Sequence, residues 1–340
     1  MKGKVVMDET EYMMRAIELA RRGEGHTRPN PAVGAVIVKD GRILGEGWHK
    51  RAGGDHAEVA AIKNARGKDL TGATIYVTLE PCSKPGRVGA CTDAIIASGI
   101  SHVVFAIPDP NPTNRGRAKR VLARHGITCT CLATASKRSS PASASVSHSQ
   151  LEAAQLLIAP FAKHVTTGLP FVTVKFAMSM DGKICDAQGD AKWISSQASR
   201  QTTGRLREHV DVIMVGAETV RKDNPSLLSH GRRNDDLVRV IISRSGRLPK
   251  DAQVFTDGKN PTLVYRDAVE ALKDLGAKGY MHVLCEGGLS LATSLAEAGL
   301  VDEWITVLAP LVIGTRPIAQ AVHFDRRSDD FTFFSARLKG

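Results

Sequence analysis

The N-terminal half of the chain alternates short apolar runs with segments of helical periodicity. Asp8 and Glu11 form a capping box that predicts the start of a helix ending near Gly23. Two apolar runs, 32–38 and 43–48, flank Asp40-Gly41 and predict a hairpin. Further helices are predicted at 55–66, 91–98 and 117–125, and further strands at 73–78, 103–107 and 128–132. Strands that alternate with helices in this way indicate a layered α/β domain.

The second half resumes the alternation after a polar interruption. Residues 133–150 are rich in serine and other small residues, which is typical of a linker. A helix is predicted at 151–164, and 223–225 is expected to be a loop. Strands are predicted at 170–178, 212–215, 239–243, 262–265, 282–285 and 305–308, with helices at 196–208, 269–275 and 290–298. We therefore predict a domain at 1–132, a linker at 133–150 and a second α/β domain at 151–340.

Composition places the chain among ordinary globular proteins. A hydrophobic fraction of 42% is enough to build cores, and a charged fraction of 24% does not predict long disorder. No apolar run approaches the length of a membrane span, and the first residues carry no secretory signal. The chain has six cysteines, a number that fits a reducing compartment in a chain of this length. We expect a cytoplasmic protein without membrane association.

Positive charge is concentrated in the first half of the chain. Residues 1–150 hold 22 Lys and Arg against 13 Asp and Glu, a net of +9 out of the +11 of the whole chain. Such an excess has three interpretations: a nucleic-acid footprint, a pocket for a phosphorylated small molecule, or a solvated surface that is basic. Aromatic residues make up only 5% of the chain, which disfavours a site that stacks flipped bases.

Three potential zinc ligands lie in this basic half. His56, Cys82 and Cys91 supply one imidazole and two thiolates, a set that leaves the fourth position of a catalytic zinc to water. Glu58 is spaced to handle protons beside that water, as in zinc deaminases. Eight residues separate the two cysteines here, instead of the two of the nucleic-acid-editing deaminases. The other cysteines are interpreted as ordinary thiols: Cys129, Cys131, Cys185 and Cys285.

The second half carries weaker signals for a nucleotide site. Gly216 and Gly287-Gly288 each follow a predicted strand, and the second pair opens a predicted helix whose N-terminus is suited to a phosphate. Glycines after strands are more often simple turns. No Gly-x-Gly-x-x-Gly occurs, so the sequence does not support a Rossmann-type dinucleotide site.

Several motifs together resemble the RibD family of bifunctional riboflavin-biosynthesis enzymes, which join a pyrimidine deaminase to a reductase. In the first half these are 30–34 (Asn-Pro-Ala-Val-Gly), His56-Ala57-Glu58, the run 78–83 with Gly86-Arg87 and Cys91, and 109–112 (Asp-Pro-Asn-Pro). In the second half they are Lys175, Asp181-Gly182, Trp193-Ile194, 216–220, 223–225 and 286–288. The resemblance implies a cytidine-deaminase-like α/β domain followed by a dihydrofolate-reductase-like α/β domain.

For the first domain, the resemblance implies zinc-dependent hydrolytic deamination of 2,5-diamino-6-(5-phosphoribosylamino)pyrimidin-4(3H)-one. Glu58 is the expected catalytic residue, with His56, Cys82 and Cys91 as metal ligands. The base and the ribose phosphate are expected to be held by Asn30, His49, Arg87, Asp109 and Asn111. Lys84 stands where many members of the family have His, so a contact to the substrate is expected to differ there.

For the second domain, the resemblance implies NADPH-dependent reduction of the ribosyl group to ribityl. The residues expected along NADPH are Ala177, Trp193, Thr219, Asp223 and the segment beginning at Gly288. Those expected to face the substrate are Lys175, Arg207, Asp223 and Glu286. Arg244 stands where relatives often have Ser, and its charge suits the 2′-phosphate of NADPH.

Two residues that differ from the RibD family pattern suggest an alternative function for the reductase half. Ala191 and His230 stand where relatives have a Ser and an Arg that hold the substrate, although Arg232 and Arg233 lie close to His230 in the sequence. The alternative is a deaminase whose reductase half is weakened or altered. A protein that binds ligands without catalysis is a further alternative, which the intact zinc motif disfavours. We expect a phosphorylated pyrimidine as substrate, no nucleic-acid partner, and a homo-oligomer.

Overall fold

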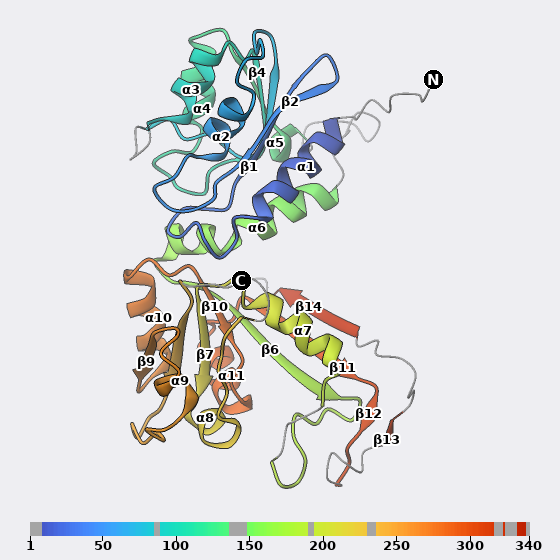
Figure 1. Cartoon of the computed structure of the whole chain (residues 1–340), viewed down its shortest axis with the longest axis vertical. Helices are drawn as coiled ribbons and strands as arrows, with labels where there is room; N and C mark the ends of the chain where they lie inside the picture. Colours follow the sequence, from blue (N-terminus) through green and yellow to red (C-terminus); the bar gives the residue numbers. More distant parts are fainter. Residues whose placement is uncertain are drawn as a thin grey trace. The chain divides into compact units, whose positions relative to one another are not determined.

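The computed structural model describes residues 9–84, 89–135, 148–189, 194–229, 236–315, 322–323 and 332–337. The chain forms two compact units, Met1–Thr167 and Gly168–Gly340, both of which are layered α/β structures (Figure 1). None of the helices within these ranges is long and apolar enough to cross a membrane.

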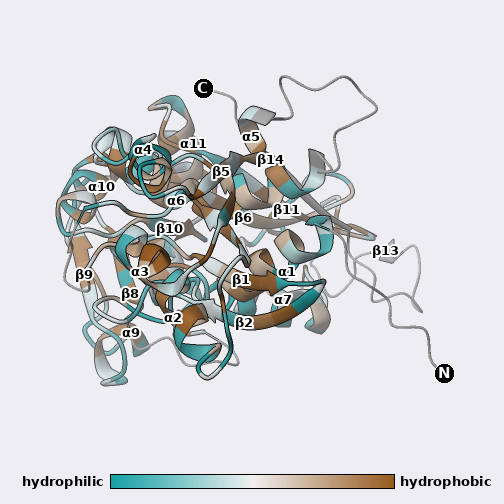
Figure 2. Cartoon of the chain, turned by 90° about the horizontal axis from the view of Figure 1, so that it is seen from above, coloured by the Kyte–Doolittle hydropathy of each residue, from teal (hydrophilic) through white to brown (hydrophobic). Residues whose placement is uncertain are grey.

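The first unit is built on a five-stranded sheet with the order β2-β1-β3-β4-β5. Strands β1 (Gly34–Lys39) and β2 (Arg42–Trp48) form the predicted hairpin, and β1 also pairs antiparallel with β3 (Thr74–Leu79). Strands β4 (His102–Ile107) and β5 (Thr128–Cys131) follow in parallel. Strand β1 is apolar at most positions and almost fully buried, and it is mostly brown in the hydropathy colouring of Figure 2.

Helices cover both faces of this sheet. Helix α1 (Glu9–Arg21) packs on β1 so closely that a side chain at Gly34 would lie 2.0 Å from the Ala16 carbonyl oxygen. Helix α2 (Ala57–Asn64) packs equally closely on Gly47 of β2. Because Gly47 pairs with Ala35, the neighbour of Gly34, the two glycines point to opposite faces of the sheet. The remaining helices are α3 (Cys91–Ser98), α4 (Arg117–Ala123), α5 (Leu132–Ala135) and α6 (His148–Thr167).

The boundary between the units lies later than we predicted. Helix α6 belongs to the first unit, because Leu151, Ala154 and Ile158 are part of its hydrophobic core. The Gln150 side-chain nitrogen also donates to the Thr10 carbonyl oxygen at 2.8 Å. The second unit therefore begins at Gly168 instead of 151. Composition predicted a break at the serine-rich stretch, but it could not show which core the next helix covers. Of the predicted linker, 136–147 lies outside the described residues.

The second unit is built on a seven-stranded sheet with the order β14-β11-β6-β10-β7-β8-β9. Strands β6 (Phe171–Ser179), β10 (His282–Cys285), β7 (Val212–Gly216), β8 (Val238–Ile242) and β9 (Thr262–Tyr265) run parallel. Strand β11 (Glu303–Ala309) is parallel to β6, and β14 (Thr332–Arg337) pairs antiparallel with β11. A short pair, β12 (Leu311–Val312) with β13 (Val322–His323), lies apart from this sheet.

Both faces of the parallel strands are covered by helices. Along β7, Val212 and Met214 belong to one hydrophobic cluster, whereas Ile213 and Val215 belong to another. Helices α10 (Ala268–Ala277) and α11 (Leu289–Glu297) contribute to the first cluster, and α8 (Ala217–Asp223) and α9 (Gln253–Thr256) to the second. The remaining helix is α7 (Gln197–Leu206), which begins after its capping residue Ser196. Parallel strands covered on both faces expose their carboxyl ends as the usual place for a ligand.

Most predicted helices and strands are present, with one difference near the expected site. We predicted no helix after β7 and a loop at 223–225, but Ala217–Asp223 forms helix α8. This helix has seven residues, too few to show a helical periodicity, and its exposed face carries the pairs of Glu218 with Arg221 and Lys222. Asp223 is therefore the last residue of a helix, and Asn224 ends the helix in the left-handed conformation.

The close packing of α2 on β2 leads to a first prediction. A Cβ at Gly47 would lie 2.3 Å from the Ala61 backbone nitrogen and 2.5 Å from the Ala57 carbonyl oxygen. Gly47→Ala should therefore displace α2 and destabilise the first unit by about 1–3 kcal/mol. Thermal unfolding of Gly47→Ala and of Gly54→Ala, where the nearest atom is 3.2 Å away, measures the difference. Equal melting temperatures for the two variants would contradict the packing argument.

Candidate metal centre and reductase cavity

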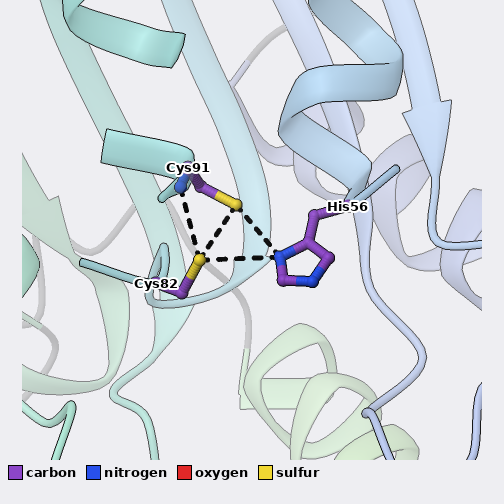
Figure 3. Close-up of side chains that lie close together, drawn as sticks. All are labelled: His56, Cys82 and Cys91. Atoms are coloured by element: carbon purple, nitrogen blue, oxygen red, sulfur yellow. Dashed lines mark hydrogen bonds between the residues drawn. The ribbon is translucent and has the colours of Figure 1, made fainter. Parts of the chain in front are cut away.

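The three predicted metal ligands come together in the first unit (Figure 3). His56 is the residue before α2, Cys91 is the first residue of α3, and Cys82 lies in the loop after β3. The Nδ1 atom of His56 is 3.2 Å from the Cys91 sulfur and 3.5 Å from the Cys82 sulfur. The two sulfurs are 3.3 Å apart. Among the described residues, these three side chains form a group of potential ligands that is compact enough to hold a metal ion.

These distances fit zinc. Zinc–nitrogen and zinc–sulfur bonds of about 2.0–2.3 Å place neighbouring ligand atoms of a tetrahedral site roughly 3.5–3.8 Å apart. The Cys91 backbone N–H donates to the Cys82 sulfur at 3.3 Å, which helps to hold that sulfur as a thiolate. Hydrogen bonding from the Cys91 thiol and from His56 lowers the pKa of Cys82 to about 4. The set supplies three protein ligands and leaves the fourth position for water, as in catalytic zinc sites.

Glu58 lies in the first turn of α2, beside the metal ligands but not among them. Its side chain is buried, with 3% of its surface exposed. Burial raises the pKa of Glu58 to about 7, and the negative charge of Cys82 acts in the same direction. A divalent cation nearby opposes this rise. A carboxyl group that titrates near neutrality is suited to accept and release a proton.

Asn30 and His49 form a pair next to the metal ligands. The His49 Nδ1 atom is 2.9 Å from the Asp55 carbonyl oxygen, and its Nε2 atom is 3.1 Å from the Asn30 side-chain nitrogen. This arrangement assigns the proton to Nδ1, so that Nε2 accepts from Asn30. Burial lowers the pKa of His49, which keeps the ring neutral. The His49 and His56 rings meet edge to face, with centroids 5.2 Å apart.

Asp109 and Asn111 lie in the loop after β4. The Asp109 carboxylate is largely buried and accepts from the Asn111 backbone N–H at 2.8 Å and from the Asn114 side chain at 2.8 Å. Burial raises the pKa of Asp109, and these hydrogen bonds oppose the rise. The Asn111 side-chain oxygen is turned to its own loop, where it accepts from Thr113. Arg87, the remaining predicted substrate contact of this domain, lies outside the described residues.

A cavity of about 590 Å³ lies in the second unit and gathers most of the residues predicted there. Its walls come from β6, α7, α8, the turn before α11, and residues Ile184, Cys185, Gly189, Ile194 and Ser195. Predicted residues that line it are Lys175, Ala177, Arg207, Thr219, Asp223, Glu286 and Gly288. Trp193, predicted to lie along NADPH, and Ala191 and His230 lie outside the described residues.

A nearly buried ion pair stands in this cavity beside an unpaired cation. Arg207 binds Glu286 through two hydrogen bonds, of 2.9 and 2.7 Å, and donates a third to the Leu228 carbonyl oxygen at 2.9 Å. The Lys175 side chain makes no hydrogen bond or ion pair with any described residue. Burial lowers the pKa of Lys175, and Arg207 adds to that effect while Glu286 opposes it. The ammonium group is therefore available to a ligand.

A second cavity, of about 400 Å³, shares Gly216, Glu218, Ser290 and Leu291 with the first. It extends along the carboxyl ends of β8 and β9, where Arg244 and Arg266 line it. A Cβ at Gly216 or Gly288 would meet no atom within 4 Å, so a ligand can approach the backbone there. Ser243 also lines this cavity, and its buried hydroxyl has no hydrogen-bond partner in the described part of the chain. Two joined cavities with backbone donors and three arginines, Arg221, Arg244 and Arg266, fit an extended phosphorylated dinucleotide.

Known protein families match the two units. Residues 7–107 match the cytidine and deoxycytidylate deaminase zinc-binding region, and residues 170–335 match the RibD C-terminal domain. Riboflavin biosynthesis protein RibD of Bacillus amyloliquefaciens is 40% identical over 336 residues, which cover 90% of this chain and 85% of that protein. The RibD protein of Escherichia coli K12 is 34% identical, with coverages of 91% and 89%. The chain belongs to the RibD family.

Solved structures of the RibD family agree with this assignment. The crystal structure of a diaminohydroxyphosphoribosylaminopyrimidine deaminase/5-amino-6-(5-phosphoribosylamino)uracil reductase from Thermotoga maritima matches with a TM-score of 0.79 and 36% identity, covering 91% of this chain and 88% of that one. Acinetobacter baumannii RibD matches with a TM-score of 0.74 and 33% identity, covering 94% and 91%.

Family membership confirms the predicted fold class and the predicted cofactors. A cytidine-deaminase-like domain that uses zinc is joined to a dihydrofolate-reductase-like domain that uses NADPH. The chain is therefore an enzyme of riboflavin biosynthesis with a deaminase and a reductase activity. This excludes the ligand-binding protein without catalysis that the sequence left open.

Some residues at these RibD-type sites were not predicted from the sequence. Asn114 was missed near the metal centre, and Ser243, Arg266 and Cys185 were missed as residues that line the two cavities. Ser243 is the last residue of one predicted strand and Arg266 directly follows another, so their position at the carboxyl edge of the sheet was a usable signal. Asn114 carries no such signal, because its contacts depend on the path of a loop.

The metal centre leads to a second prediction. The purified protein should hold about one zinc per chain, and Cys82→Ser should lose it because only two protein ligands remain. Glu58→Gln should keep its zinc, since Glu58 is not a ligand. Cys129→Ser is the matched control, because Cys129 is a half-buried thiol of β5 outside the ligand set. Metal analysis after dialysis against a chelator checks this, and full zinc content in Cys82→Ser would contradict the assignment.

Proposed function

We propose that the chain deaminates 2,5-diamino-6-(5-phosphoribosylamino)pyrimidin-4(3H)-one and then reduces the ribosyl group of the product to ribityl. The observation that carries the first step is the grouping of His56, Cys82 and Cys91 with Glu58 beside them. The joined cavities around Lys175 and Arg244 support the second step. The Thermotoga maritima relative is a diaminohydroxyphosphoribosylaminopyrimidine deaminase and 5-amino-6-(5-phosphoribosylamino)uracil reductase, which supports the same two steps here.

In the deamination, water adds to C2 of the pyrimidine and the bond from C2 to the exocyclic nitrogen breaks. His56, Cys82 and Cys91 would hold the zinc, which would supply the Lewis acidity that lets water attack at neutral pH. Glu58 accepts a proton from the attacking water and delivers a proton to the leaving nitrogen, which departs as ammonia. Its raised pKa supports this role, because the carboxyl group can hold the proton between the two transfers.

The deaminase substrate is held by polar groups around the metal centre. The neutral His49 ring and the Asn30 amide lie on the His56 side. The Asp109 carboxylate approaches from the loop after β4, and it suits the hydroxyl groups of the ribose because it accepts hydrogen bonds. We propose Asn111 and Arg87 as further contacts, with Arg87 serving the phosphate.

In the reduction, NADPH held in the two joined cavities would supply a hydride to C1′ of the ribosyl group, and the bond from C1′ to the ring oxygen would break. The ring oxygen takes up a proton. Lys175 is suited to donate it, because its lowered pKa lets the ammonium group release a proton more easily than an ordinary lysine. Arg207 keeps donor hydrogens beyond those used on Glu286 and Leu228, so it can still bind the substrate.

The assembly and location of the protein stay predictions. A homo-oligomer and a cytoplasmic location were expected from the sequence, as was the absence of a nucleic-acid partner. The weakening of the reductase by Ala191 and His230 likewise stays a prediction. The basic excess of the first half is best explained by the phosphate of the substrate, and salt-sensitive, tight binding of RNA would contradict that explanation.

The proposed function is tested by product analysis with and without NADPH. The pure protein should release ammonia from the diaminopyrimidine phosphate alone, and should form the ribityl product only when NADPH is added. Glu58→Gln should lower the rate of ammonia release by about 10²–10⁴-fold, because proton transfer is lost. Its reduction of the deaminated intermediate should be normal, which serves as an internal control for folding. Unchanged deamination by Glu58→Gln would refute the mechanism.

The second cavity leads to a prediction about the choice of cofactor. Arg244→Ser and Arg266→Ser should each raise the KM for NADPH by about tenfold or more, because each loses a charge-assisted contact to the 2′-phosphate. The KM for NADH should change little. Arg247→Ser is the matched control, since Arg247 is exposed and does not line the cavity. Equal effects on NADPH and NADH would contradict a 2′-phosphate site at these arginines.

A further inference from the structure

Two loops of the first unit carry the polar groups of the deaminase site. The loop after β3 contains Cys82, and the loop after β4 contains Asp109. The strands are parallel neighbours, and Leu79 at the end of β3 pairs with Ile107 at the end of β4. The loops therefore leave the sheet side by side, and what joins them fixes the position of Asp109 relative to the metal ligand.

Glu80 is the first of two residues that join these loops. Only 3% of its surface is exposed, and it forms no ion pair within the described ranges. Instead, one carboxylate oxygen accepts from the backbone N–H groups of Asp109 at 3.2 Å and Gly116 at 3.0 Å, and the other accepts from Ala118 at 3.2 Å. A single side chain thus holds both ends of the loop after β4.

Asn114 is the second residue that joins the two loops. It is 7% exposed, and its side-chain oxygen accepts from both the backbone N–H and the hydroxyl of Ser83, each at 3.1 Å. Its side-chain nitrogen donates to the Asp109 carboxylate at 2.8 Å. Asn114 therefore connects the residue next to the Cys82 ligand with the Asp109 side chain itself.

We infer that Glu80 and Asn114 are positioning residues that hold the Asp109 carboxylate in the orientation that binds the substrate. This inference rests on the proposed function only in taking Asp109 as a substrate contact. Glu80 fixes the backbone of Asp109, and Asn114 fixes one oxygen of its carboxylate. The other oxygen is held by the Asn111 N–H, so the group is set before the substrate arrives. Such preorganisation lowers the entropy lost on binding.

The inference is tested with Asn114→Ala and Glu80→Gln. In Glu80→Gln the amide nitrogen cannot accept, so either the Ala118 N–H or the N–H groups of Asp109 and Gly116 are left without a partner, and the nitrogen's hydrogens face those donors. Both variants should raise the KM for the deaminase substrate by about tenfold or more, because a hydrogen bond to a charged group is lost. Their kcat should change much less, since a preorganised binding group acts on ground state and transition state alike. Zinc content and reductase activity should be unchanged.

Two comparisons separate positioning from general stabilisation. If Asn114 acts through Asp109, Asn114→Ala should have little further effect on KM in the Asp109→Ala background. Asn64→Ala is the matched control, because the Asn64 side chain also accepts from a backbone N–H, that of Glu46, but at the far end of α2. It should leave KM unchanged. An unchanged KM in Asn114→Ala, additive effects with Asp109→Ala, or loss of zinc would overturn the inference.

Failure of the positioning inference can be distinguished from failure of the proposed function. A wild-type protein that releases no ammonia from the diaminopyrimidine phosphate contradicts the proposed function. Hydrogen exchange then still tests the contacts, because it needs no substrate. Glu80→Gln should speed exchange at the amides of Asp109, Gly116 or Ala118, with no change in α2. Unchanged exchange at all three amides would overturn the role of Glu80.

Discussion

The deaminase centre depends on bringing together three ligand atoms that lie far apart in the sequence. His56 is separated from Cys82 by 26 positions and from Cys91 by 35, yet their ligand atoms lie within 4.8 Å of one another. This requires the start of α2 to lie beside the start of α3, and α2 is fixed by its contact with β2. Gly45 and Gly47 allow that contact, because any side chain there would overlap the backbone of α2. The zinc site therefore depends on glycine at positions 45 and 47 of β2 as well as on its three ligand side chains.

The second unit places its polar groups by the general geometry of parallel strands. Lys175 lies on β6, Gly216 ends β7, and Glu286 directly follows β10, and these strands are neighbours in the sheet. Their carboxyl ends form one edge, so the residues meet there without any special local packing. The Glu286 carboxylate is balanced by Arg207, the residue after α7, which leaves the positive charge of Lys175 for a ligand.

The sequence predicted the parts of these sites that depend on local pattern. The zinc ligands could be identified because residue type and spacing suffice, and the strands could be identified from their apolar runs. Helix α6 was assigned to the wrong unit, since a helical periodicity shows that a face is buried but does not identify the core that it meets. The contacts of Asn114 and Glu80 could not be predicted, because they depend on the conformation of two loops. Ser243 could have been noticed at a strand end, but its unpartnered hydroxyl is visible only in three dimensions.

Three buried glutamates show how the surroundings of a carboxyl group determine its role. Glu286 binds a guanidinium through two hydrogen bonds, and Glu80 accepts from three backbone N–H groups, so permanent donors hold both side chains in place. Glu58 forms no ion pair among the described residues, and burial raises its pKa to about 7. A carboxylate bound by permanent donors would lose those contacts on taking up a proton. For Glu58, hydrogen bonds from its own backbone N–H and from Cys91 only partly offset the effect of burial on its pKa. Its surroundings therefore suit a group that carries a proton from water to the leaving nitrogen.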